Sequence, residues 1–241
     1  MTSALPRTAL AATLACAFLL AACARTPGPA PSAGSTPTPE FEVTSTPAPL
    51  ASAEVTSYRG KRLTPISGLY ENSILGPQRI DRKKYRLKVD GLVKKPLSLT
   101  YDEVLAIRPA FAKIVKLQCV EGWSVTFLWE GVRVKDLVAK AGGAGSGANT
   151  VIFHAHDGYT SSLPLDYLDK RDILLAYREN AVPLTAEWGW PLQLVAEDKW
   201  GYKWVKWIER VEVSSDAAYR GYWESRGYSD SGDLDKPEFG P

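Results

Sequence analysis

The sequence of 241 residues has few of the side chains that form disulfides or bind metals: three cysteines, two histidines and one methionine. So few cysteines exclude a disulfide-rich scaffold. A Cys-x-x-Cys-His segment is absent, so no covalently attached haem is expected in this chain. Neither charge sign dominates, since 29 basic residues face 27 acidic ones. This balance gives no support for nucleic-acid binding or for strong attraction to a charged membrane surface.

Long apolar runs are also missing, except at the N-terminus. Residues 9–22 are almost all apolar or small and follow Arg7, which is the pattern of an export signal. The run is shorter than the roughly 20 residues that a membrane-spanning helix needs. Residues 20–23 (LAAC) resemble a bacterial lipobox, in which the cysteine is acylated and becomes the first residue of the mature protein. We predict a lipoprotein signal peptide over residues 1–22 and a lipid anchor on Cys23; the alternative is an ordinary signal peptide.

The rest of the chain divides by composition. Residues 23–54 are rich in proline, alanine, serine and threonine, which predicts an extended tether. Residues 55–214 are long enough for one domain with a hydrophobic core. Residues 215–241 form an aromatic tail, which we expect to pack onto the core or to border a pocket. All eight tryptophans fall between Trp123 and Trp223, which favours a rigid, buried pocket.

Periodicity in the domain indicates short strands with a few helices. Alternating apolar residues predict strands at residues 85–91, 111–119, 151–155, 192–196 and 207–213. Helices are predicted after Thr100, where Glu103 completes a capping box, over residues 134–141, and as a short turn around residues 166–168. Because strands and helices do not alternate regularly, the expected class is α+β with mixed β-sheets.

Cys119 is the cysteine expected to remain in the mature domain, since Cys16 and Cys23 belong to the N-terminal segment. An unpaired thiol in an exported protein calls for an explanation. A thiolate is a good ligand for a soft transition metal. The alternative is a small buried core residue.

Several blocks together resemble one family. Their order is residues 117–124 (LQCVEGWS), 157–159 (DGY), 163–165 (LPL), 174–177 (LLAY), 191–195 (PLQLV) and 201–207 (GYKWVKW). This set resembles the molybdopterin-binding domain of the sulfite oxidase superfamily. The cysteine block is closer to the catalytic subunit of the bacterial periplasmic methionine-sulfoxide reductase than to animal or plant sulfite oxidase. The resemblance implies a sulfite-oxidase-type fold, one molybdenum held by a single pyranopterin, and oxygen-atom transfer.

The resemblance also implies roles for individual residues. Cys119 matches the metal ligand, and Glu121 and Tyr159 match residues on the substrate side. The alternatives are a surface or structural salt bridge for Glu121 and packing of the turn for Tyr159. The predicted cofactor contacts are Asn72, Cys119, Gln193, Gly201, Tyr202, Lys203 and Lys206. Relatives usually carry arginine where this chain has Gln193, and histidine or asparagine where it has Trp188. Lys199 or Arg178 is a candidate for supplying the missing charge.

The resemblance further implies a separate electron-transfer partner, haem- or quinone-linked, because no haem domain precedes the core. A monomer on the extracytoplasmic side of a membrane is expected, acting on a small or methionine-sulfoxide-like substrate. Family members commonly carry a twin-arginine signal, whereas this N-terminus has Arg7 alone, so the export route stays open. Two alternatives remain: a zinc or copper site at His154 and His156, and a cofactor-free binding or structural lipoprotein with the same fold.

Overall fold

The computed structural model describes residues 42–44, 53–66 and 71–240, with only the backbone given for residues 42–44. The predicted signal peptide, Cys23 and most of the predicted tether lie outside the described residues. Within the described part, no helix is long and apolar enough to cross a membrane.

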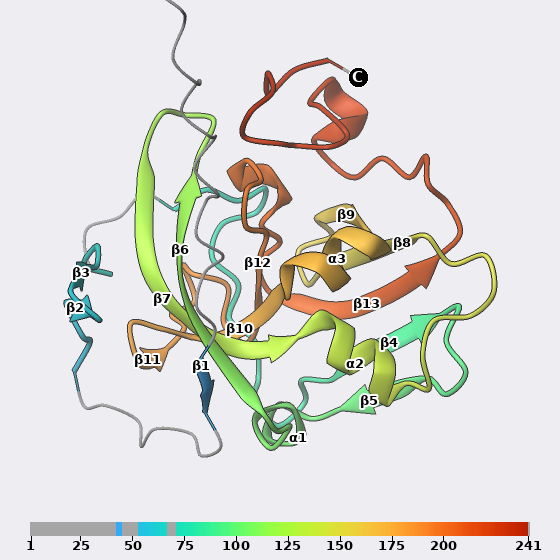
Figure 1. The fold of residues 1–241 in the computed structure, drawn as a ribbon, viewed down its shortest axis with the longest axis horizontal. Helices are drawn as coiled ribbons and strands as arrows, with labels where there is room; N and C mark the ends of the chain where they lie inside the picture. The colour runs from blue at the N-terminus through green and yellow to red at the C-terminus, as the bar shows by residue number, and fades with distance from the viewer. Residues whose placement is uncertain (1–41, 45–52, 67–70, 241) are drawn as a thin grey trace, which may run out of the picture. The chain divides into compact units, whose positions relative to one another are not determined.

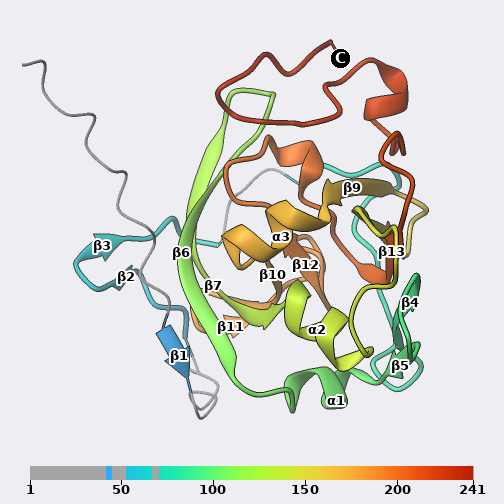
Figure 2. The same cartoon turned by 45° about the vertical axis from the view of Figure 1, so that its right-hand side comes forward.

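Two β-sheets build the domain, and Figures 1 and 2 show the long β6–β7 hairpin along one side and the second sheet along the other. The first sheet is antiparallel throughout. Its strands are β1 (Glu42–Thr44), β6 (Ala110–Gln118), β7 (Ser124–Arg133), β10 (Leu174–Glu179), β11 (Val182–Pro183) and β12 (Gln193–Val195).

The second sheet is mixed, because β13 pairs in parallel with β4 and antiparallel with β8. Its strands, in spatial order, are β5 (Leu97–Leu99), β4 (Leu87–Gly91), β13 (Ile208–Ser214), β8 (Thr150–Ala155) and β9 (Thr160–Pro164). A small separate hairpin pairs β2 (Ser57–Tyr58) with β3 (Lys61–Arg62). The predicted α+β class with mixed sheets is therefore confirmed.

The helices are short: α1 (Tyr101–Leu105), α2 (Val134–Lys140), α3 (Leu165–Arg171), and the 3-10 turns η1 (Gly201–Lys203) and η2 (Glu224–Arg226). The capping box predicted for α1 is present, since the Glu103 amide donates to Thr100 Oγ1 at 3.2 Å and the Thr100 amide donates to Glu103 Oε2 at 2.7 Å. Helix α2 ends at two glycines with positive φ, Gly142 and Gly143, as predicted.

One boundary differs in a way that matters. The predicted strand 111–119 corresponds to β6, which ends at Gln118, so Cys119 is not a strand residue. The Cys119 amide donates to the Trp123 carbonyl at 2.9 Å and the Gly122 amide to the Cys119 carbonyl at 3.1 Å. Cys119 therefore begins the turn that joins β6 to β7, and its side-chain direction follows from the turn rather than from strand alternation.

Candidate active site

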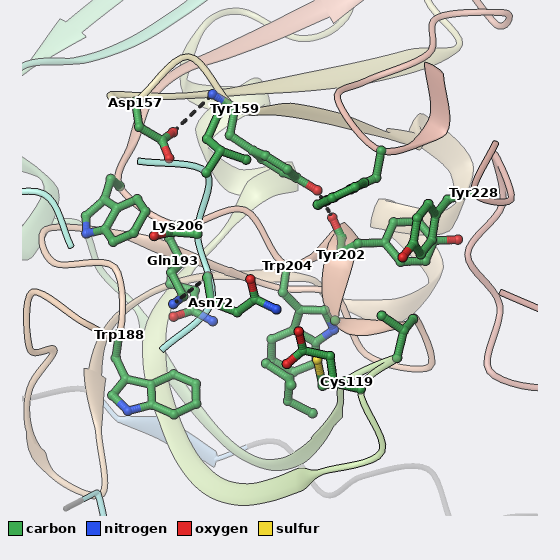
Figure 3. Close-up of a pocket in the computed structure, with 18 of the residues that line it drawn as sticks. Asn72, Cys119, Asp157, Tyr159, Trp188, Gln193, Tyr202, Trp204, Lys206 and Tyr228 are labelled. Carbon is green, nitrogen blue, oxygen red and sulfur yellow. Dashed lines mark hydrogen bonds between the residues drawn. The ribbon is translucent and has the colours of Figure 1, made fainter. Parts of the chain in front are cut away.

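A cavity of about 270 Å³ lies where loops from both sheets meet, and Figure 3 shows its labelled lining residues. Five separate stretches of the chain supply the wall, within residues 72–74, 117–123, 157–159, 188–207 and 223–228. In Figure 3, Cys119 lies on one side of the cavity and Tyr159 on the opposite side. The predicted residues Asn72, Cys119, Glu121, Tyr159, Gln193, Gly201, Tyr202 and Lys206 all line this cavity.

Cys119 is 7 % exposed and is an unpaired cysteine. Burial raises the pKa of its thiol. Three smaller effects lower this pKa: hydrogen bonds from the Glu121 backbone amide and the Asn72 side chain, and the positive charge of Lys206. The raised pKa favours the protonated thiol at neutral pH, and a bound metal would displace this proton.

Gly201 brings η1 close to this thiol. A Cβ at position 201 would lie 3.2 Å from the Gln118 carbonyl oxygen and 3.3 Å from the Cys119 Cα. Both separations are tighter than ordinary van der Waals contact, so any larger residue would push η1 away from the β6–β7 turn. Glycine at this position keeps the η1 wall of the cavity against Cys119.

Glu121 and Tyr159 border the cavity with different surroundings. Glu121 is exposed, and its Oε2 accepts a hydrogen bond from Trp123 Nε1 at 3.2 Å. Tyr159 follows the turn after β8, where its amide donates to Asp157 Oδ1 at 3.0 Å. Its hydroxyl donates to the Tyr202 carbonyl, and burial raises its pKa well above the usual value. The phenol therefore stays neutral and in this structure points toward η1.

Lys206 connects the cavity to the segment before β4. Its Nζ donates to the Asn72 carbonyl at 3.2 Å and lies 3.3 Å from Glu71 Oε1. The ammonium group also lies over the rings of Trp188, at 5.6 Å, and Trp207, at 5.3 Å. Burial lowers the pKa of Lys206, and the charge of Glu71 opposes that shift.

Gln193 presents the cavity with unsatisfied hydrogen-bonding groups. It is fully buried in β12, and neither its Nε2 nor its Oε1 has a hydrogen-bond partner among the described residues. Ser73 Oγ, which lines the same cavity, is likewise unpartnered within the described part of the chain. A buried polar group without a partner costs about 1–3 kcal/mol. These donors and acceptors therefore fit a polar ligand that fills the space beside them.

Lys203 is the predicted cofactor residue that the structure places elsewhere. Its side chain is fully buried and is not among the described residues that line the cavity. Its Nζ lies 2.6 Å from Glu224 Oε1 and 3.0 Å from the Asp230 carbonyl oxygen. Because Lys203 points toward the C-terminal segment, its ammonium group binds protein carboxylate and carbonyl oxygens instead of facing the cavity.

The candidates for replacing the missing arginine charge also lie away from the cavity wall. Arg178 pairs with Glu130 at 2.9 Å, and Lys199 pairs with Asp233. The two histidines pair with carboxylates of β13: His154 with Glu212 at 2.8 Å and His156 with Glu209 at 2.6 Å. No group of three or more His, Cys, Asp or Glu side chains suited to a metal ion occurs among the described residues. The zinc or copper alternative therefore lacks a third protein ligand there.

Many of the cavity-lining residues that were given no role in the sequence analysis are aromatic. The unassigned lining residues include Trp123, Trp204, Trp207, Trp223 and Tyr228. The sequence indicated these residues only as a group. The tryptophans all fall between Trp123 and Trp223, which predicts a pocket but does not show which rings line it.

Comparison with known proteins agrees with this geometry. Residues 75–223 match the oxidoreductase molybdopterin binding domain. The chain belongs to this family. It is 38% identical over 154 residues to the uncharacterized oxidoreductase YuiH of Bacillus subtilis, covering 64% of this chain and 76% of that protein.

Two other relatives have more specific names. The putative protein-methionine-sulfoxide reductase subunit YedZ1 of Azospira oryzae is 32% identical, over 62% of this chain and 56% of that protein. The mitochondrial sulfite oxidase of Rattus norvegicus is 30% identical, over 73% of this chain and 38% of that protein. This chain therefore spans about half or less of those two relatives.

A solved structure shares the fold. The sulfane dehydrogenase SoxCD of Paracoccus pantotrophus matches with a TM-score of 0.61 and 22% identity, over 78% of this chain and 50% of that chain. The predicted sulfite-oxidase-type fold is thereby confirmed.

The protein is a molybdopterin-dependent oxidoreductase, and the residues present fit its cofactor. The Cys119 thiolate would ligate molybdenum, since soft sulfur suits such a metal. Gln193 and Ser73 have hydrogen-bonding capacity that a pterin would satisfy, and Asn72, Gly201 and Lys206 complete the polar wall. When bound, the cofactor supplies two-electron redox chemistry at the metal. The protein's own contribution would be to position the cofactor beside Cys119 and the polar wall.

Proposed function

We propose that this protein is a lipid-anchored, extracytoplasmic oxidoreductase that removes the oxygen atom of a sulfoxide. A separate haem- or quinone-linked protein supplies the electrons. The sulfoxide is reduced to a thioether, and its oxygen leaves as water after two electrons and two protons are taken up. Glu121, at the exposed edge of the cavity, is assigned to proton delivery.

The observation that carries this proposal is the charge of the cavity around Cys119. Among the described lining residues, the charged side chains are one lysine, Lys206, and two acids, Glu121 and Asp157. Lys206 already has Glu71 as a partner. A sulfite dianion would meet more negative than positive charge there, whereas a neutral sulfoxide meets neither repulsion nor a large desolvation cost. The similarity to YedZ1, a putative protein-methionine-sulfoxide reductase subunit, supports the same substrate class.

A substrate comparison tests the chemistry. The full chain is produced in a host that synthesises the cofactor, and its molybdenum and pterin contents are measured. We expect reduced viologen dye to drive reduction of methionine sulfoxide with a kcat/KM at least about tenfold above that for sulfite oxidation with ferricyanide. Sulfite oxidation that equals or exceeds sulfoxide reduction would contradict the proposal. A well-folded protein that never takes up the cofactor would favour the binding or structural alternative.

A Cys23→Ala substitution tests the anchor. We expect labelled palmitate to be incorporated into the wild type and not into the variant, because the acyl chains attach at Cys23. Cys16→Ala is the matched control, since Cys16 lies in the segment that is removed. Palmitate incorporation that survives Cys23→Ala would rule out this anchor.

A further inference from the structure

The segment after β13 forms part of the cavity wall. Trp223 and Tyr228 both line the cavity, although the family match ends at residue 223. In Figure 1 this segment is the red chain that returns over the η1 turn. It therefore adds to the cavity a surface that lies largely beyond the matched domain.

Several interactions of buried groups hold this segment in place. Glu224 Oε1 accepts hydrogen bonds from Lys203 Nζ at 2.6 Å and from Ser161 Oγ at 2.5 Å. The Tyr202 hydroxyl donates to the Ser229 carbonyl at 2.8 Å, and the Trp200 amide donates to the Gly232 carbonyl at 2.8 Å. Because Glu224 directly follows Trp223 and Ser229 directly follows Tyr228, these contacts fix the two rings relative to η1.

The rings form one continuous aromatic cluster. The ring centroids of Trp223 and Tyr228 are 5.2 Å apart, and those of Tyr202 and Tyr228 are 5.0 Å apart in an edge-to-face arrangement. Figure 3 shows Tyr202 and Tyr228 on one side of the cavity and Gln193, Lys206 and Trp188 on the other. The cavity thus has an aromatic side made of Tyr202, Trp223 and Tyr228, and a polar side that carries the unpartnered amide of Gln193.

We propose that this aromatic side is the subsite for the organic group on the substrate sulfur, such as the side chain of a methionine sulfoxide. The inference rests on the proposed function, because it places the sulfoxide substituent opposite the polar side that fits the cofactor. Aromatic rings attract polarisable sulfur and methyl groups and carry no formal charge that would need a counter-ion. The C-terminal segment is therefore a determinant of substrate choice.

The test separates substrate binding from cofactor binding. In Trp223→Ala and Tyr228→Ala, we expect KM for N-acetyl-methionine sulfoxide and its Kd by calorimetry to rise roughly threefold to tenfold. The kcat and the molybdenum content should stay within about twofold of wild type, since neither ring lies on the polar side. Trp223→Phe should restore most of the affinity. Phe239→Ala is the matched control, because Phe239 packs on Tyr228 with its ring centroid 4.6 Å away but is not among the described lining residues.

Each other outcome has a distinct meaning. Folded variants with unchanged KM and Kd would overturn the subsite, and so would loss of molybdenum in place of affinity. If the wild type binds the sulfoxide and the variants weaken that binding, but no turnover occurs, the subsite holds and the proposed reductase function fails. If the wild type neither binds nor reduces sulfoxides, both proposals fall.

Discussion

Replacing Cys119 by alanine is expected to lower turnover more than about 100-fold. Replacing a residue that only supports a metal ligand typically lowers activity about 10–100-fold, and this change would remove the predicted direct ligand itself. The fold should persist, because the hydrogen bonds that form the Cys119 turn come from the backbone and not from the thiol. Turnover, molybdenum content and the visible absorption of the metal–thiolate bond are measured together.

The controls for this prediction lie in the same hairpin. Ser124→Ala changes an exposed residue at the start of β7 that is not among the described lining residues, and it should retain wild-type turnover and absorption. Cys119→Ser keeps the size of the side chain but replaces a soft sulfur by a hard oxygen, so its activity should also collapse. Full turnover in Cys119→Ser would show that Cys119 is not the ligand.

The second large effect concerns stability. Lys203→Met is expected to lower the free energy of unfolding by about 3–5 kcal/mol, the usual cost of removing one partner from a buried ion pair. The Glu224 carboxylate is 1 % exposed, and the Ser161 hydroxyl would remain as its side-chain hydrogen-bond donor within the described part of the chain. Its Oε2 has no hydrogen-bond partner within the described chain even in the wild type. Urea unfolding followed by fluorescence measures the change.

A double-mutant cycle isolates this pair. Lys203→Met combined with Glu224→Leu should cost less than the sum of the two single changes, because no charge is left buried. Arg220→Met is the matched control, since its pair with Asp230 joins two side chains about half exposed and should change stability far less. Limited proteolysis should cut the C-terminal segment faster in Lys203→Met. Near-wild-type stability of that variant would contradict the assignment of a buried, stabilising pair.

The sequence predicted those helices and strands that are defined by interactions between residues close together in the chain. The capping box of α1 needs only Thr100 and Glu103 three residues apart, and the glycines that end α2 directly follow its last turn. Strands with one buried face, such as β4, show the alternation that periodicity detects. By contrast, β10 is buried at every position, so no alternation marks it as a strand.

The ordered set of motifs identified the family and predicted Cys119 as the metal ligand, because a ligand and its flanking residues are adjacent in the chain. The motifs did not show what each side chain meets. From the sequence, Lys203 is predicted to contact the cofactor phosphate, because it follows a glycine and a tyrosine. In the structure its partner is Glu224, which lies 21 residues further along the chain. In the sequence, Gln193 stands where relatives usually carry an arginine. Only the fold shows that its amide is buried beside the cavity without a hydrogen-bond partner among the described residues.

The sequence by itself therefore determined the family and the fold class, and it predicted Cys119 as a site residue and a pocket rich in aromatic side chains. The tertiary structure decided which residues share the cavity, where Lys203 points, and that the C-terminal segment supplies part of the wall. The reason is physical. Hydrogen-bond caps and amphipathic alternation act over a few residues, whereas a cavity forms where five distant stretches of chain are brought together by packing.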